Sequence, residues 1–344
     1  MSGGEARAPL VLVTGADGYL GSQLVAALAG APGICRGVVA VDVRAVPGAR
    51  RHAGVRYEVA DICDQRTADL IIASAPEVVI HLAAMVSPPP GTTRERQYQV
   101  DVAGTRRVLS ACLAAGVRRI IVTSSGAAYG YYADNPASIG EDQPLRGNPE
   151  FAYSDHKRQV EEMLAQARND HPELEQVVLR LCTVLGNTTR NQITDLFDRR
   201  LLLAVSGAAS PFSFVWDGDV VAGLVRAIAA GPPGVYNLAG DGSVTMQEIA
   251  ALLGKRCLTV PAWLLATALA VLSRLRLTQY GPEQVNFLRY RPVLDNAKLK
   301  QVFGFLPRFG SRGAFERFLA ARRGQPSGAL GSDNDGGREG AGRQ

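Results

Sequence analysis

The chain has 344 residues, of which 47% are hydrophobic and 20% are charged, a balance typical of a globular protein with an ordinary core. At roughly 150 residues per domain, this length predicts about two domains. The formal net charge of +5 suits an anionic ligand, but the arginines are scattered and no dense basic run with interleaved aromatic residues is present, so nucleic acid is not an expected partner.

Cysteines, histidines and apolar runs narrow the class further. The five cysteines form no CxxC pair and the four histidines form no ligand-like pair, so we expect neither a disulfide framework nor a metal site. The N-terminus shows no signal-peptide pattern, and the longest apolar stretch, Pro261 to Leu272, is shorter than the ~20 residues of a membrane span. We therefore expect a soluble, cytoplasmic protein with no integral membrane segment.

Apolar runs alternate with helical patterns through the first two-thirds of the chain. Leu10–Thr14 is such a run and ends at a glycine, as a buried parallel strand does. Further strands are predicted at Val38–Asp42, Val55–Ala60, Val78–Leu82, Arg118–Ser124 and Gln176–Leu181, and helices at Tyr19–Leu28, Arg94–Ala115 and Tyr153–Arg168. This alternation predicts an α/β fold, a Rossmann-type doubly wound parallel sheet with helices on both faces.

The alternation loosens after Gly186. Short strands are predicted at Phe212–Val215 and Val235–Leu238, and helices at Asp219–Ala230, Thr245–Leu253, Ala262–Leu275 and Ser311–Ala321. We expect a Rossmann domain over residues 9–186, with 213–240 returning to it. A smaller, mainly helical substrate-binding region is expected over 187–212 and 241–323. Residues 324–344 are rich in Gly, Ser and Asp and are expected to be disordered.

A glycine-rich turn separates the first strand from the first helix and reads Thr14-Gly15-Ala16-Asp17-Gly18-Tyr19-Leu20-Gly21. Glycines at this spacing let the backbone turn tightly and approach a pyrophosphate, while the helix N-terminus offers unpaired N–H donors and a positive dipole end. In its strand–turn–helix context, the motif predicts a dinucleotide cofactor. The residues expected to hold it here are Gly15, Gly18, Tyr19, Leu20 and Gly21.

The end of the second strand indicates which dinucleotide is bound. Asp42 stands there, and a carboxylate at this place accepts hydrogen bonds from the ribose hydroxyls and repels a 2′-phosphate. Arg44, two residues further on, is suited to bind a 2′-phosphate and leaves NADP open. Asp42 favours NAD.

Tyr153 and Lys157 are four residues apart, on one face of a predicted helix. An adjacent ammonium lowers the pKa of a phenol, ordinarily ~10, so we expect Tyr153 to exchange a proton while hydride joins or leaves the same carbon. Ser125 follows a predicted strand at the carboxyl edge of the sheet, where substrates bind in open α/β folds. A Ser–Tyr–Lys set of this kind predicts an oxidoreductase.

Taken together, the motifs resemble the extended short-chain dehydrogenases/reductases, the NAD-dependent epimerase/dehydratase family. The resemblance extends over residues 9–322 and rests on motifs in the family's order and spacing. These are Thr14–Gly21, Asp42, Asp61-Ile62, His81-Leu82-Ala83-Ala84, Gly104-Thr105, Ser124-Ser125 with Tyr129-Gly130, and Tyr153 with Lys157.

The resemblance implies roles for the matching positions. Ser125 would orient the substrate oxygen, Tyr153 would be the acid–base, and Lys157 would bind the nicotinamide ribose and tune the tyrosine. The implied NAD site also contains Asp61, Ile62, Leu82, Ala83, Ala84 and Thr123. A small-molecule substrate and a homodimer through helices 94–115 and 150–168 are further implications. By contrast, His81 is expected to pack at its strand end without a catalytic role.

Three departures from the family's pattern concern catalysis and substrate. Many relatives have asparagine where this chain has Asp101, and a carboxylate cannot donate the hydrogen bonds of an amide. Nucleotide-sugar epimerases usually carry an asparagine shortly after the sixth strand, where this chain has Cys182-Thr183. They also tend to carry an arginine in the place of Phe212. These losses disfavour an ordinary nucleotide sugar, although Arg289 and Arg291 are candidates to compensate.

Residues 261–277 are strongly apolar and bear on the substrate. We expect them to pack a helix into the core; the alternatives are an apolar substrate pocket and a surface helix that meets lipid. The favoured function is NAD-dependent hydride transfer at a secondary alcohol or ketone carbon of an apolar substrate. A nucleotide-sugar epimerase or dehydratase, and a non-catalytic dinucleotide sensor, are the alternatives.

Overall fold

The computed structural model describes residues 7–89, 91–209, 211–275, 281 and 284–324. The predicted C-terminal tail, apart from Gly324, and the end of the apolar 261–277 segment lie outside the described residues. Within them, seven parallel strands form one sheet in the order β10-β6-β5-β4-β1-β2-β3. The strands are β1 (Leu10–Thr14), β2 (Gly37–Asp42), β3 (Val55–Val59), β4 (Val78–His81), β5 (Arg119–Ser125), β6 (Glu175–Leu181) and β10 (Gly234–Leu238).

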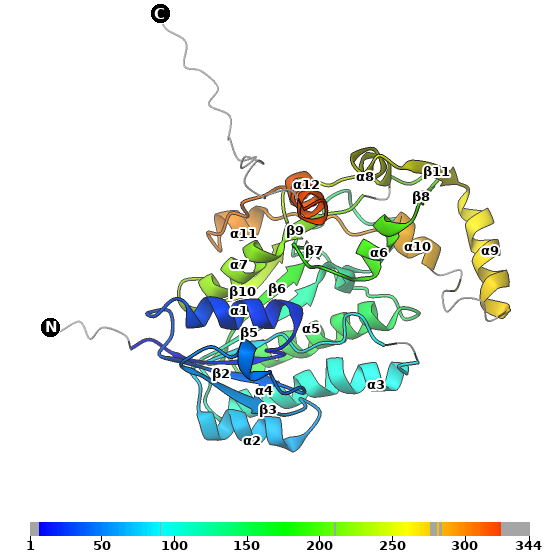
Figure 1. The fold of residues 1–344 in the computed structure, drawn as a ribbon. Helices are drawn as coiled ribbons and strands as arrows, with labels where there is room; N and C mark the ends of the chain where they lie inside the picture. The colour runs from blue at the N-terminus through cyan, green and yellow to red at the C-terminus, as the bar shows by residue number, and fades with distance from the viewer. Residues whose placement is uncertain (1–6, 90, 210, 276–280, 282–283, 325–344) are drawn as a thin grey trace, which may run out of the picture.

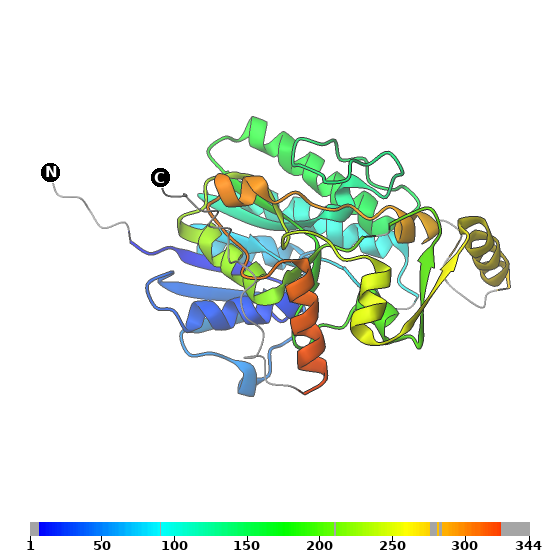
Figure 2. The same cartoon turned by 90° about the horizontal axis from the view of Figure 1, so that it is seen from above.

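Helices cover both faces of this sheet (Figures 1 and 2), which confirms the predicted Rossmann-type doubly wound fold. Along β1, Val11 and Val13 pack toward α1 and α7, whereas Leu12 packs toward α2, α4 and α5. Both faces of the central strands are therefore buried, which explains their unbroken apolar sequence. The helices are α1 (Tyr19–Ala29), α2 (Gln65–Ser74), α4 (Thr105–Ala114), α5 (Ala152–Asp170) and α7 (Asp217–Ala229).

The predicted long helix over residues 94–115 is interrupted by a π-helical segment. It begins as α3 (Arg94–Tyr98), widens at Gln99–Gly104 and continues as α4. A Cβ on Gly104 would lie 2.8 Å from the side chain of Ile62, so the helix lies close against the end of β3. π-Helical turns often occur at functional sites, and this one carries Asp101.

A smaller region lies beyond the carboxyl ends of the strands (Figure 1). Its two parallel strand pairs are β7 (Thr183–Leu185) with β9 (Phe214–Trp216), and β8 (Leu201–Val205) with β11 (Arg256–Val260). Its helices are α6 (Gln192–Asp198), α8 (Met246–Leu253), α9 (Ala262–Arg274), α10 (Gln284–Arg289) and α12 (Ser311–Arg322). Between the last two, α11 (Ala297–Gln301) returns to pack against β10 of the large sheet. Several of these elements are too short to show a clear hydrophobic period, and the sequence did not predict β8 or β11.

The core of this region is aromatic. Phe197 packs edge-on against Phe212 and Phe315, with ring centroids 5.7 and 5.3 Å apart, and Phe214 stacks on Phe212 at 5.7 Å. Helix α9 takes no part in this core. None of its residues is buried, so the expectation that this apolar segment packs into the core is wrong for residues 262–274.

Candidate active site

The glycine turn after β1 is shaped for close approach of a ligand to the backbone. Gly15 has φ +70°, and a Cβ there would lie 2.7 Å from the backbone nitrogen of Ala83. A Cβ on Gly21 would lie 2.0 Å from the carbonyl oxygen of Gly15. Only glycine fits at these two positions, and Gly18 caps the N-terminus of α1. The turn thus has the close-approach geometry that a pyrophosphate requires.

Tyr19 connects this turn to the smaller region. Its hydroxyl donates to a carboxylate oxygen of Asp217 at 2.7 Å and accepts from the hydroxyl of Thr189 at 2.7 Å. Burial and the hydrogen bond to Asp217 raise the pKa of Tyr19 to about 12. The phenol therefore stays protonated and acts as a fixed hydrogen-bonded bridge.

Asp42 and Arg44 lie beside the glycine turn at the end of β2. The buried carboxylate of Asp42 accepts from the backbone nitrogens of Asp17 at 2.9 Å and Arg44 at 3.0 Å. These two bonds leave lone pairs for ribose hydroxyls. The Arg44 side chain is exposed and lies 3.6 Å from Asp17.

Asp61 and Ile62 follow β3 on the same edge of the sheet. Asp61 accepts from the backbone nitrogen of Cys63 at 2.9 Å and from the guanidinium of Arg96 at 3.0 Å. Despite partial burial, which opposes ionisation, these bonds lower the pKa of Asp61. Ile62 is buried against Gly104. An acceptor beside an apolar wall is suited to an adenine ring.

A cavity of about 590 Å³ contains most of the predicted site. Its walls include the residues predicted for the cofactor and for catalysis at Gly15, Gly18, Tyr19, Leu20, Gly21, Leu82, Ala84, Thr123, Ser125, Tyr153 and Lys157. The cavity does not reach Asp42, Arg44, Asp61, Ile62 or Ala83, which lie further along the sheet edge or behind the backbone. Within the described part of the chain, no cluster of side chains could hold a metal ion.

Ser125, Tyr153 and Lys157 meet at the carboxyl end of β5. Ser125 accepts a hydrogen bond from the backbone nitrogen of Ala127 at 3.1 Å and hydrogen-bonds Tyr153. The ammonium of Lys157 donates to the carbonyl oxygen of Thr123 at 3.0 Å and lies 5.9 Å from the centre of the Tyr153 ring. The three side chains predicted as a set are therefore neighbours.

The electrostatics of Tyr153 differ from the prediction. Burial raises the pKa of Tyr153 to about 12, the hydrogen bond from Ser125 opposes this rise, and the charge of Asp101 adds to it. Burial also lowers the pKa of Lys157, against the opposing effect of Asp101 and Glu161. The expectation that the adjacent Lys157 ammonium lowers the pKa of Tyr153 below its ordinary value is wrong for this structure, because desolvation of the phenol is the larger effect.

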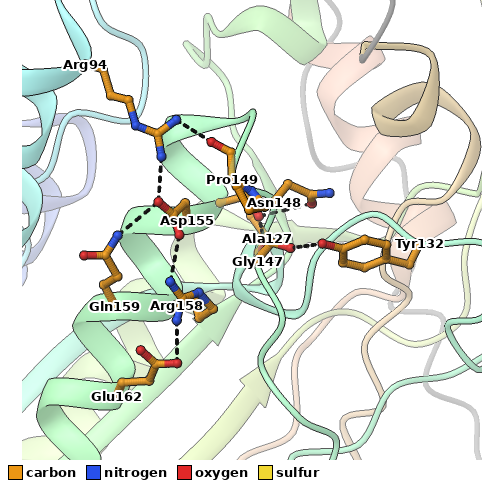
Figure 3. Close-up of polar contacts among 11 residues, drawn as sticks. Arg94, Ala127, Tyr132, Gly147, Asn148, Pro149, Asp155, Arg158, Gln159 and Glu162 are labelled. Atoms are coloured by element: carbon orange, nitrogen blue, oxygen red, sulfur yellow. Dashed lines mark hydrogen bonds and ion pairs between the residues drawn. The ribbon is translucent and has the colours of Figure 1, made fainter.

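Polar contacts in front of α5 fix the position of Tyr153 (Figure 3). Arg94 donates to the carbonyl oxygen of Pro149 and to the carboxylate of Asp155 at 2.6 Å, and so joins α3 to the first turn of α5. The hydroxyl of Ser154 donates to the carbonyl oxygen of Ala127 at 2.6 Å. This last bond joins the first turn of α5, which carries Tyr153, to the turn after Ser125.

Asp101, in the π-helical segment, is almost fully buried. It accepts from the backbone nitrogen of Met85 at 2.7 Å, and its second oxygen lies 3.4 Å from a ring nitrogen of His156. His81 is buried between the hydroxyls of Thr14 and Thr105, at 2.7 and 3.0 Å. Burial lowers the pKa of His81 to about 3, so this histidine is neutral and structural, as the sequence predicts.

The far end of the cavity is aromatic and contains one buried cation. Ring contacts lead from Tyr153 to Phe151 at 6.2 Å and from Phe151 to Phe287 at 5.7 Å. The guanidinium of Arg291 lies 5.1 Å from the centre of the Phe287 ring and 3.8 Å from that of Phe212. The sequence did not predict Phe151 or Phe287 as site residues, because only the folded chain brings α10 beside the start of α5.

Arg291 lacks a carboxylate partner among the described residues. Its Nη1 donates to the carbonyl oxygen of Leu288 at 3.3 Å, but Nε and Nη2 are buried without a hydrogen bond. Burial lowers the pKa of this guanidinium to about 9. The described residues lining the cavity include Lys157, Arg190 and Arg291 but neither Asp nor Glu. The lining of the cavity is thus electropositive, and the two donors of Arg291 without partners are buried beside it, between the rings of Phe212 and Phe287.

Solved structures resemble this chain over most of its length. MoeE5 in complex with UDP-glucuronic acid and NAD is 26% identical, with a TM-score of 0.69 over 91% of this chain and 98% of that one. A short-chain dehydrogenase/reductase superfamily protein from Agrobacterium tumefaciens with bound NAD is 25% identical, with a TM-score of 0.69 over 92% and 97%. A UDP-glucose 4-epimerase from Thermotoga maritima shares the fold, with a TM-score of 0.70 at 20% identity over 92% and 99%.

Sequence relatives and a family model agree with this fold. An uncharacterized protein of Mycobacterium bovis is 25% identical over 316 residues, which is 91% of this chain and 84% of that protein. The UDP-glucose 4-epimerase of Azospirillum brasilense is 31% identical over 191 residues, 54% of this chain and 52% of that enzyme. A model of the NAD-dependent epimerase/dehydratase family matches residues 11–239, more than half of the chain. The chain is therefore a member of the NAD-dependent epimerase/dehydratase family.

Proposed function

We propose that this enzyme transfers hydride between NAD and a secondary alcohol or ketone carbon of a nucleotide-diphosphate sugar. The observation that carries the proposal is the buried guanidinium of Arg291, which has two donors without partners in a cavity lined by no carboxylate within the described residues. An arginine in this state is suited to a phosphate group, because a guanidinium offers paired donors to an oxyanion. Arg291 would replace the arginine that relatives carry in the place of Phe212.

The aromatic ring contacts give the proposed substrate an orientation. Tyr153, Phe151 and Phe287 follow one another along the cavity and end beside Arg291. A diphosphate bound at Arg291 would place the attached sugar along these rings, with its reacting carbon toward Tyr153. The relative MoeE5, solved with UDP-glucuronic acid and NAD, supports this substrate class.

Bound NAD would supply hydride acceptance and return at the nicotinamide carbon. The glycine turn would hold its pyrophosphate, Asp42 its adenosine ribose, and Asp61 with Ile62 its adenine. Lys157, held by the carbonyl oxygen of Thr123, would donate to the second ribose. Under these assignments, residues 9–186 and 213–240 would surround the cofactor, and 187–212 and 241–323 would surround the substrate.

Tyr153 would move the proton of the reacting hydroxyl while Ser125 holds the same oxygen. Because burial places the pKa of Tyr153 at about 12, the tyrosine is a proton donor at neutral pH. Acting as a base requires additional positive charge nearby, which oxidised nicotinamide and the Lys157 ammonium together would supply. We therefore expect proton removal to begin only when cofactor is bound.

An apolar secondary alcohol or ketone, the substrate favoured by the sequence, is the second candidate. Phe151, Phe287 and Leu294 line the cavity and give it apolar surface. An uncharged substrate would, however, leave the two buried donors of Arg291 without partners, which costs about 1–3 kcal/mol per unsatisfied group. The anionic substrate is favoured for this reason.

A thermal-shift titration separates the two candidates. Full-length enzyme with saturating NAD would be titrated with UDP and, as a matched control, with uridine, which lacks the diphosphate. We expect UDP at 100 times its dissociation constant to stabilise the fold by about 2.7 kcal/mol, and uridine to have little effect. An enzyme that responds to neither ligand, yet reduces an apolar ketone with NADH, would contradict the nucleotide-sugar proposal.

A further inference from the structure

Helix α9 is apolar and mostly exposed; only the face with residues 262, 265, 266, 269 and 273 is half-buried, on the side where the helix contacts α10. Its large side chains are accessible to solvent: Trp263 is 69% exposed, Leu264 46%, Val271 52% and Leu272 40%. A helix on the surface of a globular protein normally buries one apolar stripe, whereas α9 has no buried residue among its thirteen. It lies at the margin of the molecule, away from the seven-stranded sheet (Figures 1 and 2).

The few polar groups of α9 are satisfied within the helix. The hydroxyl of Thr267 donates to the carbonyl oxygen of Trp263 at 2.8 Å, and that of Ser273 donates to the carbonyl oxygen of Ala270 at 3.1 Å. These hydroxyls therefore need no water as a partner. The helix can enter an apolar medium without leaving a polar side chain unpaired, except for the indole N–H of Trp263 and for Arg274, which lie at its two ends.

The neighbouring strand pair continues the apolar surface. In β8, Leu201 and Leu203 point outward and are 44% and 40% exposed, while the alternating residues Leu202 and Ala204 are buried. Leu203 is paired in register with Leu258 of β11, which is 51% exposed. Strand β11 leads directly into α9. We call residues 199–205 and 256–275 together the apolar end.

The charges of the apolar end have one sign. Its arginines, at positions 199, 200, 256 and 274, are exposed, and the described residues offer none of them an ion pair. The apolar end contains neither Asp nor Glu. Elsewhere on the surface the pattern is mixed: exposed Arg50 pairs with Asp17 at 2.8 Å and half-buried Arg146 with Asp134 at 2.8 Å. Exposed Arg106 and Arg190 have no carboxylate partner among the described residues, but they do not stand beside an exposed apolar helix.

We propose that the apolar end docks this enzyme peripherally onto an anionic lipid membrane. Apolar side chains combined with unpaired arginines fit the interface of a negatively charged bilayer, where the rings and leucines enter the acyl boundary and the arginines meet the head groups. A second copy of this chain fits less well. In a symmetric dimer through this surface, arginines would face arginines without a carboxylate between them.

The docked membrane would lie close to one wall of the cavity. Helix α9 contacts α10, and α10 carries Phe287, which lines the cavity next to Arg291. Since no helix among the described residues is long and apolar enough to cross a bilayer, the attachment would be at the surface. It would also be reversible, because one short helix buries limited apolar area.

Vesicle co-sedimentation of the full-length protein tests the proposal. The probes are vesicles of phosphatidylcholine and phosphatidylglycerol in equal proportion, compared with phosphatidylcholine alone. We expect binding to the mixed vesicles at low salt, weaker binding to the neutral ones, and a decrease with added salt. Replacing Arg256 and Arg274 together by alanine should weaken binding by about fivefold per arginine.

The decisive variant is W263S/L272S, with V302S/L306S as its matched control. Val302 and Leu306 are each 55% exposed and lie outside the apolar end. Only the α9 variant should lose vesicle binding, by about tenfold or more, while both variants keep the melting temperature and NAD affinity of the wild type. Absent vesicle binding, or equal loss in both variants, would overturn the proposal. So would a wild-type dimer that W263S/L272S converts to monomer without any change in vesicle binding.

Discussion

Replacing Arg291 by methionine is expected to stabilise the ligand-free enzyme while removing its response to UDP. The guanidinium is buried, and its pKa falls from the ordinary 12.5 to about 9. At 1.36 kcal/mol per pKa unit, this difference corresponds to roughly 5 kcal/mol of unfavourable burial. Stacking on Phe212 and Phe287 returns about 2 kcal/mol. At pH 8 the group is charged in both the folded and the unfolded state, so the net cost of about 3 kcal/mol is fully present.

Methionine has a similar length, no charge and a flexible shape that fills the same space between the rings. We therefore expect R291M to raise the free energy of unfolding by about 1–3 kcal/mol, or a few degrees in melting temperature for a chain of this length. With UDP bound, the variant should be less stable than the wild type. Two charge-assisted hydrogen bonds to the ligand are lost, so the affinity for UDP should fall by about tenfold or more.

Differential scanning fluorimetry with and without UDP measures both effects in one experiment. The matched control is R289M, since Arg289 stacks on Tyr290 at 4.6 Å and does not line the cavity. It should keep the wild-type response to UDP. A ligand-free R291M that melts well below the wild type would refute the reasoning, because the guanidinium would then be a structural group with a favourable net contribution.

Four further outcomes are expected. G21A should lower the free energy of unfolding by about 1–3 kcal/mol and weaken NAD binding, because its Cβ would lie 2.0 Å from the carbonyl oxygen of Gly15; G48A, with open space around it, is the control for both measurements. Y153F should lower turnover by about a hundredfold or more with NAD affinity, measured by calorimetry, unchanged. D101N should shift the pH profile of substrate oxidation to lower pH, since the carboxylate raises the pKa of Tyr153 and its removal lowers that pKa; a profile that moves to higher pH would contradict the assignment. We expect a homodimer through α3, α4 and α5; light scattering should give the mass of a dimer, and the mass of a monomer would contradict this prediction.

The sequence predicted the half of the site that depends on local motifs. Gly15, Gly18 and Gly21 are constrained by contacts within one turn and with the segment after the neighbouring strand. Their spacing, in its strand–turn–helix context, therefore indicates a ligand that approaches the backbone. Tyr153 and Lys157 are brought together by one helical turn. In both cases the geometry follows from short-range structure, which a sequence pattern records directly.

The substrate half depends on contacts between distant segments. Arg291 was a candidate from its charge alone, but its lack of a partner becomes visible only when Phe212 and Phe287 close around it. The raised pKa of Tyr153 likewise follows from burial, which no spacing shows. The apolar composition of α9 predicted that the helix packs into the core, because apolar residues are usually buried. Composition gives the amount of apolar surface but does not identify the partner that covers it.

The hydrogen-bonded bridge at Tyr19 has a consequence for the order of events. Tyr19 belongs to the helix whose N-terminus faces the proposed pyrophosphate, whereas Thr189 belongs to the segment that leads into the proposed substrate region and Asp217 begins α7. Cofactor that fixes the first turn of α1 would thereby restrict the motion of Thr189 and the residues after it. Because this part of the cavity would already be ordered, the substrate would bind with a smaller loss of conformational entropy. The enzyme should accordingly follow an ordered kinetic sequence in which dinucleotide enters first and leaves last.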